Sequence, residues 1–401
     1  MKEMTTAPLV SVIVLCYRNF RYVYDAIGSV LLQKYPAIEL VISDDGSSNF
    51  PAEDIEKFVE KNKKENIVSV TIKHHEKNVG TVKHLNKAIS LTTGQYIMSL
   101  SADDMIDNAD VLLRYVDGFT KYPQADILMA QTAMYGEDMD KVQYYFVQPH
   151  IRDLLMGEQK DDALFSELVQ HAYLPSVSTF FKRDFFEKYG KFDETYDLVE
   201  DWSMHLKLTR KHIFIAYLDF PSIRHRSGGV SHGNTEGTNS TYYRYLQDLN
   251  HTYLNDVKPY LNRVAPEIRE KVEYRHRQDV AWIHFHYRDK QHGLLGMIRY
   301  VFSHPIITFQ NLAKIFYHQC YGRAWHPFIL ALLFSLVSPW ALEAFSISCV
   351  AVGWPAEIVM WAGSIIAWGS GLLMAFSIFF LVFYLLSAIY CCITEQMSLY
   401  F

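Results

Sequence analysis

Short apolar runs alternate with helix-forming patterns over the first 100 residues, and this alternation limits the possible folds more than any other feature of the chain. The run Leu9–Leu15 has the continuous apolar character of a buried parallel strand, and further strands are expected at Ile38–Ser43, Val68–Lys73 and Tyr96–Leu100. Between them, apolar residues recur at helical spacing in Val23–Leu31, Ile55–Val59 and Val82–Ile89. Strand–helix repeats of this length form right-handed crossovers. The sequence therefore predicts an α/β fold with a Rossmann-like, mainly parallel sheet flanked by helices.

The C-terminal part of the chain is the second strong constraint, because it is almost without charge. Residues 327–394 contain no Lys or Arg, and residues 358–394 contain no charged residue at all. A helix that crosses a membrane needs about 20 mainly apolar residues. The stretch therefore predicts transmembrane helices, two in the preferred interpretation and three in the competing one. A pair of buried helices in a soluble domain is the alternative, although such helices normally have a polar face.

The segment before this stretch mixes basic and aromatic residues from His292 to His326. Such a mixture is typical of a helix lying in the membrane interface, and a surface helix packed on a soluble domain fits it equally well. Basic residues that flank a membrane span usually stay on the cytoplasmic side. Together the patterns predict an α/β domain over residues 1–232, a helical and partly interfacial linker over 233–326, and a transmembrane region over 327–394.

The charge balance and the cysteine content exclude several classes of protein. Lys and Arg number 38 and Asp and Glu number 44, which gives a formal net charge of −6, whereas nucleic-acid binders usually carry a basic excess. Five scattered Cys residues give no disulfide framework and favour a reducing compartment. The polar segment Met1–Pro8 is not typical of a secretory signal. Leu15–Asn19 follows the first predicted strand in place of a G-x-G-x-x-G motif, which argues against a dinucleotide-binding dehydrogenase.

Two acidic pairs follow predicted strands. Asp44-Asp45 comes after the second strand and Asp103-Asp104 after the fourth, so both are expected at the carboxyl edge of the sheet, where open α/β folds bind ligands. Adjacent carboxylates are tolerated when a cation or hydrogen-bond donors hold them, and hard oxygen ligands suit Mg²⁺ or Mn²⁺. A plain turn is the alternative for Asp44-Asp45, because Gly46 and two serines follow it.

A third acidic pair, Glu200-Asp201, opens a helical pattern that continues through Leu206 and Leu208. Carboxylates in the first turn of a helix are favoured by the helix dipole, so capping alone would explain the pair. The functional alternative is a general base, a carboxylate that accepts the proton of an attacking hydroxyl.

In their order and spacing, these residues resemble the motifs of the large inverting family 2 glycosyltransferases of the GT-A fold. The resemblance covers about residues 8–232. It rests on Val10–Val14 with Tyr17 and Asn19, Glu39–Ser47, Asn78–Gly80, Asn86, Gly94–Ile97, Ser101–Asp104, and Gly190–Asp193 with Glu200–Trp202. By this resemblance the chain is expected to be a glycosyltransferase of the bacterial surface-polysaccharide type with a C-terminal membrane anchor.

The resemblance also implies a role for each site residue. Asp44 or Asp45 would contact the base of a nucleotide sugar, and Asp103 would lie near its ribose. Asp104 would coordinate the divalent metal on the diphosphate, and Asp201 would be the general base. The family's late-loop histidine falls in register with Arg226, beside His225, so Arg226 is expected to share the charge of the diphosphate. The expected catalytic residues are Asp201 and Glu200, the donor-binding residues are Tyr17, Asp44, Asp45, Lys83, Asp103 and Arg226, and the metal ligands are Asp104 and Asp103.

The expected chemistry is transfer with inversion at the anomeric carbon, assisted by a divalent metal, Mn²⁺ or Mg²⁺, that offsets the charge of the leaving nucleoside diphosphate. The implied partners are a nucleotide-sugar donor, a lipid-linked (polyprenyl-bound) glycan acceptor and the membrane, with no nucleic acid. The expected location is the plasma (inner) membrane with the catalytic domain in the cytoplasm. A non-catalytic, nucleotide-binding partner of a membrane polysaccharide complex is the alternative, and the acidic residues Asp103, Asp104 and Asp201 argue against it.

Overall fold

The structure, a computed structural model, describes residues 7–159, 162–227, 241–284, 287, 292–310 and 364. The chain divides into two compact units, residues 1–280 and 281–401. Within the described residues of the first unit, nine strands form one sheet in the order β3-β2-β1-β4-β8-β6-β9-β5, with β7 paired to β6. The strands are β1 (Val10–Cys16), β2 (Ile38–Asp44), β3 (Ile67–His74), β4 (Tyr96–Ser101), β5 (Met105–Ile106), β6 (Ile127–Tyr135), β7 (Val142–Tyr145), β8 (Thr179–Lys182) and β9 (Ile215–Arg226).

The N-terminal half of the sheet confirms the predicted strands, and the other half adds antiparallel strands that the sequence did not indicate. β1 pairs in parallel with β2 and β4, and β2 pairs in parallel with β3. β8, however, runs antiparallel to both β4 and β6, and β5 runs antiparallel to β9. Six of the nine described strands, β1, β2, β3, β4, β6 and β9, thus run in one direction, so the sheet is mainly parallel as predicted, with β5, β7 and β8 reversed. β8 has four residues and β5 has two, too few for an apolar run or a period of two to mark them in the sequence.

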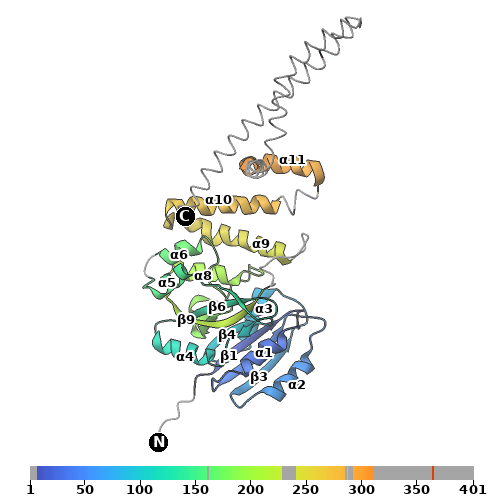
Figure 1. Cartoon of the computed structure of the whole chain (residues 1–401), viewed down its shortest axis with the longest axis vertical. Coiled ribbons are helices and arrows are strands. Elements are labelled where there is room, and N and C mark those ends of the chain that lie inside the picture. Colours follow the sequence, from blue (N-terminus) through green and yellow to red (C-terminus); the bar gives the residue numbers. More distant parts are fainter. Residues whose placement is uncertain are drawn as a thin grey trace, which may run out of the picture. The chain divides into compact units, whose positions relative to one another are not determined.

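Helices cover both faces of this sheet (Figure 1). Successive strand residues point to opposite faces, so Val12 and Leu40 belong to one buried cluster while Ile13 and Val41 belong to the other. The first face is covered by α1 (Val23–Leu31), α2 (Ala52–Asn62) and α4 (Val111–Lys121). The second is covered by α3 (Thr81–Ser90), α5 (Pro149–Met156), α6 (Ala163–Leu168), α7 (Asp184–Tyr189) and α8 (Glu200–Arg210).

The second face also receives a segment from beyond the predicted domain boundary at residue 232. This segment contains α9 (Thr241–Thr252), the π-helix η2 (Tyr253–Val257), the 3₁₀-helix η3 (Lys258–Arg263) and α10 (Pro266–Ile283). Tyr253, Val257 and Leu261 are buried in the same cluster as the apolar residues of α8. The first compact unit therefore continues to Val280. The polar run 228–240 has the composition of a linker, yet the chain after it returns to the same core.

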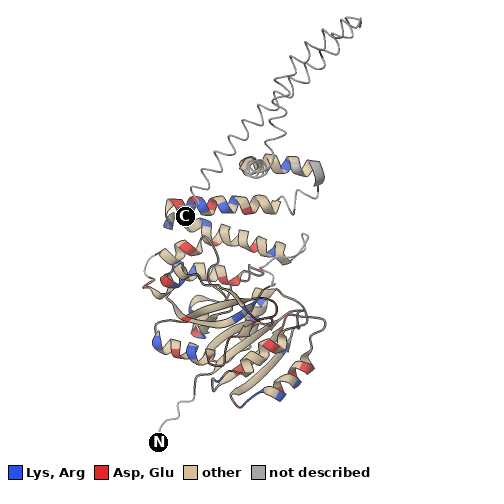
Figure 2. Ribbon diagram, viewed as in Figure 1, with Lys and Arg blue, Asp and Glu red and all other residues tan. Residues whose placement is uncertain are grey.

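The second unit is described mainly by α11 (Gly293–Ser303). Figure 2 shows basic and acidic residues along α10, whereas α11 contains one charged residue, Arg299. Leu295 and Phe302 on α11 are 78% and 81% exposed. In the described part of the chain, no helix has both the length and the apolar character needed to cross a membrane. The predicted spans within 327–394 lie outside the described residues, apart from Ser364.

Candidate active site

The turn after β1 places Tyr17 and Arg18 at the carboxyl edge of the sheet. The Asn19 N–H donates to the Tyr17 carbonyl at 2.6 Å, and Arg18 adopts the left-handed conformation with φ of 59°. The Arg18 N–H donates to Ser47 Oγ at 2.8 Å, and Tyr17 is 39% exposed. Left-handed residues other than glycine are uncommon and cluster at functional sites. Arg18 is thus a cation at the donor edge, the carboxyl edge of the sheet where the nucleotide-sugar donor is expected to bind. Arg18 was not assigned to the site from the sequence, although its position directly after a buried strand could have indicated it.

Asp44 stabilises the turn that it begins, which is the alternative expected from the sequence in place of a binding role. Its carboxylate is fully buried and accepts hydrogen bonds from Ser47 N–H at 2.8 Å and Ser47 Oγ at 2.6 Å. His74 Nδ1 lies 2.8 Å from Asp44 Oδ2. These partners fix the turn at the end of β2, while the predicted contact of Asp44 with a nucleotide base stays a prediction.

Asp45 holds the loop that leads into α3. Its oxygens accept hydrogen bonds from Asn78 Nδ2 at 2.8 Å, Val79 N–H at 3.0 Å and Gly80 N–H at 3.1 Å. The two loops touch at Gly46, where φ is +76° and an added Cβ would lie 2.4 Å from the Lys77 carbonyl carbon. The donor-side loops after β2 and β3 are therefore one interlocked structure.

Lys83 lies in the first turn of α3, directly after this interlocked loop, and its side chain is exposed. One residue earlier, the Val82 N–H donates to the Asp197 carbonyl at 3.3 Å. The start of α3 is thereby joined to the chain that approaches α8. Lys83 is accessible to an anionic ligand at this edge, as its predicted role requires.

Asp103 and Asp104 differ sharply in their surroundings. Asp104 is fully buried; its Oδ2 lies 2.8 Å from His225 Nδ1, and its Oδ1 accepts the Arg226 N–H at 3.0 Å. Asp103 is partly exposed. Burial raises the pKa of the Asp103 carboxyl, and the charge of Asp104 raises it further. Burial opposes protonation of His225, but the charge and hydrogen bond of Asp104 outweigh it, so the His225 pKa is raised.

Arg226 supports the Asp103 turn from inside the protein. Its side chain is 5% exposed, and its Nε donates to the Asp103 carbonyl at 3.0 Å. The guanidinium lies 3.6 Å from the centre of the Tyr22 ring, and it also donates to the Glu137 carbonyl. The predicted contact of Arg226 with a diphosphate stays a prediction, and the present partners give this side chain a structural role.

The predicted metal site consists of Asp103 and Asp104. Among the residues that the structure describes, no group of three or more His, Cys, Asp and Glu side chains is arranged to hold a metal ion. Mg²⁺ in nucleotide enzymes is commonly bound by only one or two carboxylates together with phosphate oxygens and water. The partly exposed carboxylate of Asp103 beside Asp104 is a donor set that fits this kind of site.

Glu200 and Asp201 open α8, which confirms the predicted helix start. Glu200 Oε1 accepts a hydrogen bond from Ser176 Oγ at 3.0 Å, and Asp201 Oδ1 accepts one from the Trp202 N–H at 2.7 Å. Burial raises the pKa of both carboxyls, and the charge of Asp201 raises the pKa of Glu200 further. A carboxylate whose pKa is shifted toward neutrality is suited to accept and release a proton.

Known proteins similar to this chain are named as glycosyltransferases or polysaccharide synthases. Residues 11–190 match the family model described as Glycosyl transferase family 2. An uncharacterized glycosyltransferase of Rickettsia typhi is 28% identical over 214 residues, which are 52% of this chain and 61% of the relative. The poly-beta-1,6-N-acetyl-D-glucosamine synthase of Staphylococcus epidermidis is 27% identical over 202 residues, 49% of this chain and 46% of the synthase. The matched regions thus span about half to three-fifths of the length of these curated relatives.

Solved structures give more distant similarities. A mannosyltransferase from Pyrobaculum calidifontis, in complex with GDP-Man and Mn²⁺, aligns with 96% of this chain and 87% of its own, at a TM-score of 0.45 and 15% identity. S. aureus TarS 1–349, in complex with UDP-GlcNAc, aligns with 74% of this chain and 89% of its own, at a TM-score of 0.44 and 16% identity.

Proposed function

We propose that this chain, which matches the Glycosyl transferase family 2 model over residues 11–190, transfers a sugar from a nucleotide-sugar donor to an acceptor hydroxyl with inversion. The observation that carries the proposal is the position of the Glu200-Asp201 pair. The pair opens α8, and the chain leading into that helix is bonded through Asp197 to the start of α3. A potential base is therefore built next to the loop that Asp45 holds at the donor edge.

In the proposed reaction, Asp201 accepts the proton of the acceptor hydroxyl. The hydroxyl oxygen then forms the new bond to the anomeric carbon, while the bond from that carbon to the diphosphate oxygen breaks and the nucleoside diphosphate leaves. Attack from the face opposite the diphosphate inverts the anomeric centre. The raised pKa of Asp201 favours proton acceptance near neutral pH. Once ionised, the carboxylate also stabilises positive charge at the anomeric carbon.

A divalent ion, Mn²⁺ or Mg²⁺, would supply charge neutralisation for the diphosphate when bound. We propose Asp103 as the carboxylate that faces it, because Asp103 is partly exposed while Asp104 is buried with both oxygens hydrogen-bonded. In this proposal Asp104 would support the site through its contacts with His225 and the backbone N–H of Arg226. Tyr17, Lys83 and Arg18 line the same edge and contact the nucleotide sugar.

We further propose that the acceptor is a glycan on a membrane lipid of the polyprenyl type and that the protein is bound to the plasma membrane, with residues 1–280 in the cytoplasm. Two features support this: the nearly uncharged stretch 327–394 and the exposed apolar residues of α11. Attachment to the same membrane would raise the effective concentration of acceptor at the site. One relative's name, a poly-N-acetylglucosamine synthase, makes UDP-N-acetylglucosamine the first donor to test.

The test is release of nucleoside diphosphate by the full-length protein in membranes, with a panel of UDP-, GDP- and dTDP-sugars in Mn²⁺, Mg²⁺ or chelator. Asp201→Asn should keep donor binding and lower turnover by roughly 10²–10⁴-fold, the usual contribution of a general base. Asp184→Asn is the matched control, since it makes the same change at an exposed position in the first turn of α7.

Two results would count against the proposal. Normal turnover of Asp201→Asn would remove this residue from the mechanism. Binding of nucleotide without consumption of any donor would favour the alternative, a non-catalytic partner in a polysaccharide complex.

A further inference from the structure

We propose that Asp248, on α9, is a positioning residue that holds the start of α8 and thereby fixes the place of the Asp201 carboxylate. This inference rests on the proposed function, in which Asp201 is the general base. Asp248 is 7% exposed and comes from a segment that the sequence assigned to a linker.

A single oxygen of Asp248 accepts hydrogen bonds from three consecutive backbone N–H groups. Its Oδ2 accepts hydrogen bonds from the N–H groups of Asp197 at 2.9 Å, Leu198 at 2.6 Å and Val199 at 3.2 Å. Val199 is the N-cap residue of α8 and makes no side-chain capping hydrogen bond. Buried backbone N–H groups need acceptors, and here α9 provides the acceptor for all three. The path of the chain into Glu200 is therefore set by Asp248.

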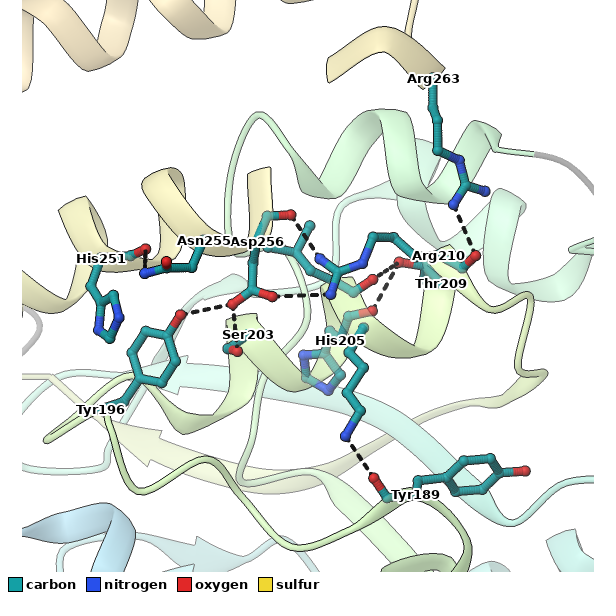
Figure 3. Close-up of polar contacts among 12 residues, drawn as sticks. Tyr189, Tyr196, Ser203, His205, Thr209, Arg210, His251, Asn255, Asp256 and Arg263 are labelled. Carbon is teal, nitrogen blue, oxygen red and sulfur yellow. Dashed lines mark hydrogen bonds and ion pairs between the residues drawn. The ribbon is translucent and has the colours of Figure 1, made fainter. Parts of the chain in front are cut away.

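A second carboxylate from the same segment, Asp256 on η2, binds two residues of α8 and one residue that precedes it. Asp256 accepts hydrogen bonds from Tyr196 Oη at 2.7 Å and Ser203 Oγ at 2.8 Å, and its ion pair with Arg210 spans 3.0 Å. Figure 3 shows Asp256 between these three side chains. All three partners of Asp256 are side chains, whereas Asp248 binds the backbone that enters the helix. The two carboxylates thus hold different groups: Asp248 accepts hydrogen bonds from the backbone that enters α8, whereas Asp256 binds side chains on either side of the catalytic pair.

Charge effects on pKa values also connect α9 with the Glu200-Asp201 pair. The charge of Asp248 contributes to raising the pKa of Glu200, after burial and the charge of Asp201. Burial raises the pKa of Tyr245, also on α9, and the charge of Asp201 adds to the rise. α9 therefore lies within electrostatic range of the catalytic pair. Because a misplacement of about 1 Å in a reacting group lowers rates by about 10²-fold, loss of the Asp248 contacts should be visible in the chemical step.

The experiment compares Asp248→Asn with wild type and with Asp256→Asn in the full-length protein. Asn keeps the shape of Asp and one oxygen that can take the place of Oδ2, but it lacks the negative charge, so its hydrogen bonds to the three N–H groups are weaker. Asp248→Asn should lower kcat by about 10- to 100-fold and leave the affinity for the donor unchanged, with UDP-N-acetylglucosamine as the first probe. Asp256→Asn should lower the melting temperature and keep most of kcat, because Asp256 binds side chains and leaves the backbone that enters α8 to Asp248.

Amide hydrogen exchange gives a readout that does not depend on turnover. Peptides covering residues 197–203 should exchange faster in Asp248→Asn than in wild type, and Asp248→Glu, which keeps a carboxylate, should recover part of both the protection and kcat. A kcat for Asp248→Asn equal to that of wild type would overturn the positioning role. A parallel loss of kcat and donor affinity in both Asn variants would show a merely structural role and would also overturn it. Lack of turnover in wild type itself would instead refute the proposed function.

Discussion

Asp256 gives the most quantitative prediction about the stability of the first unit. The side chains of Asp256 and Arg210 are only 15% and 11% exposed, and the same carboxylate accepts hydrogen bonds from Tyr196 and Ser203. Removing one partner of a buried ion pair destabilises a protein by about 3–5 kcal/mol, because the other charge stays buried and unpaired. Since this pair keeps some exposure, we expect Asp256→Ala to lower the free energy of unfolding by about 3 kcal/mol.

Thermal unfolding of the purified protein measures this effect. For a domain of this size each kcal/mol corresponds to roughly 2–4 °C, so the melting temperature should fall by roughly 6–12 °C. Asp219→Ala is the control: Asp219 is 54% exposed and 4.0 Å from Arg152, and such surface pairs contribute about 0–1 kcal/mol. Adding Arg210→Met to Asp256→Ala should restore part of the loss, because no unpaired charge remains. Equal shifts for Asp256→Ala and Asp219→Ala, or no recovery in the double variant, would refute this reasoning.

Four further predictions concern the site and the membrane. Because burial raises the pKa of Asp201 and the base acts when deprotonated, kcat should fall on acidification at a pH well above the ordinary Asp value of about 3.9; an acid limb near that value would contradict the assignment. At Gly46 φ is +76°, and a Cβ added there would lie 2.4 Å from the Lys77 carbonyl carbon. Gly46→Ala should therefore destabilise the protein by roughly 1–3 kcal/mol and weaken nucleotide binding. A variant with the melting temperature and nucleotide affinity of wild type would count against the interlocked loops. Asp103→Asn should abolish the dependence of donor affinity on Mn²⁺, and a wild-type affinity that is the same in chelator would exclude a metal role. The full-length chain should stay in the membrane fraction during carbonate extraction, and its release would contradict the spanning prediction.

The N-terminal half of the sheet could be predicted because β1 and β2 are almost entirely buried and therefore mainly apolar. Each of these strands is followed by a polar turn. The insertion of β8 between β4 and β6 had no comparable signal. β8 has four residues, and its pairing with β4 joins segments far apart in the sequence, so nothing local to either strand indicates it.

The positions of the acidic pairs followed from the rule that parallel strands present their carboxyl ends at one edge. Which carboxylate of a pair is buried did not follow, because the burial comes from distant residues. Asp104 is covered by His225 from β9, and Asp45 is bonded to the loop before α3. No sequence motif marks Asp248, which is one Asp in a helix rich in Tyr. Its proposed role depends on the backbone N–H groups before α8 that it contacts.

The late position of α9 and η2 in the chain has a consequence for synthesis on the ribosome. Proteins fold from the N-terminus as they emerge, so the sheet and the donor-side loops can form while residues 241–263 are still being made. Until those residues appear, the N–H groups of 197–199 lack the Asp248 acceptor and Arg210 lacks its partner. We therefore expect the newborn chain to recognise nucleotide before it can transfer sugar. Catalytic competence would arrive only when translation nears the apolar C-terminal region, so that sugar donors are not consumed by unfinished chains.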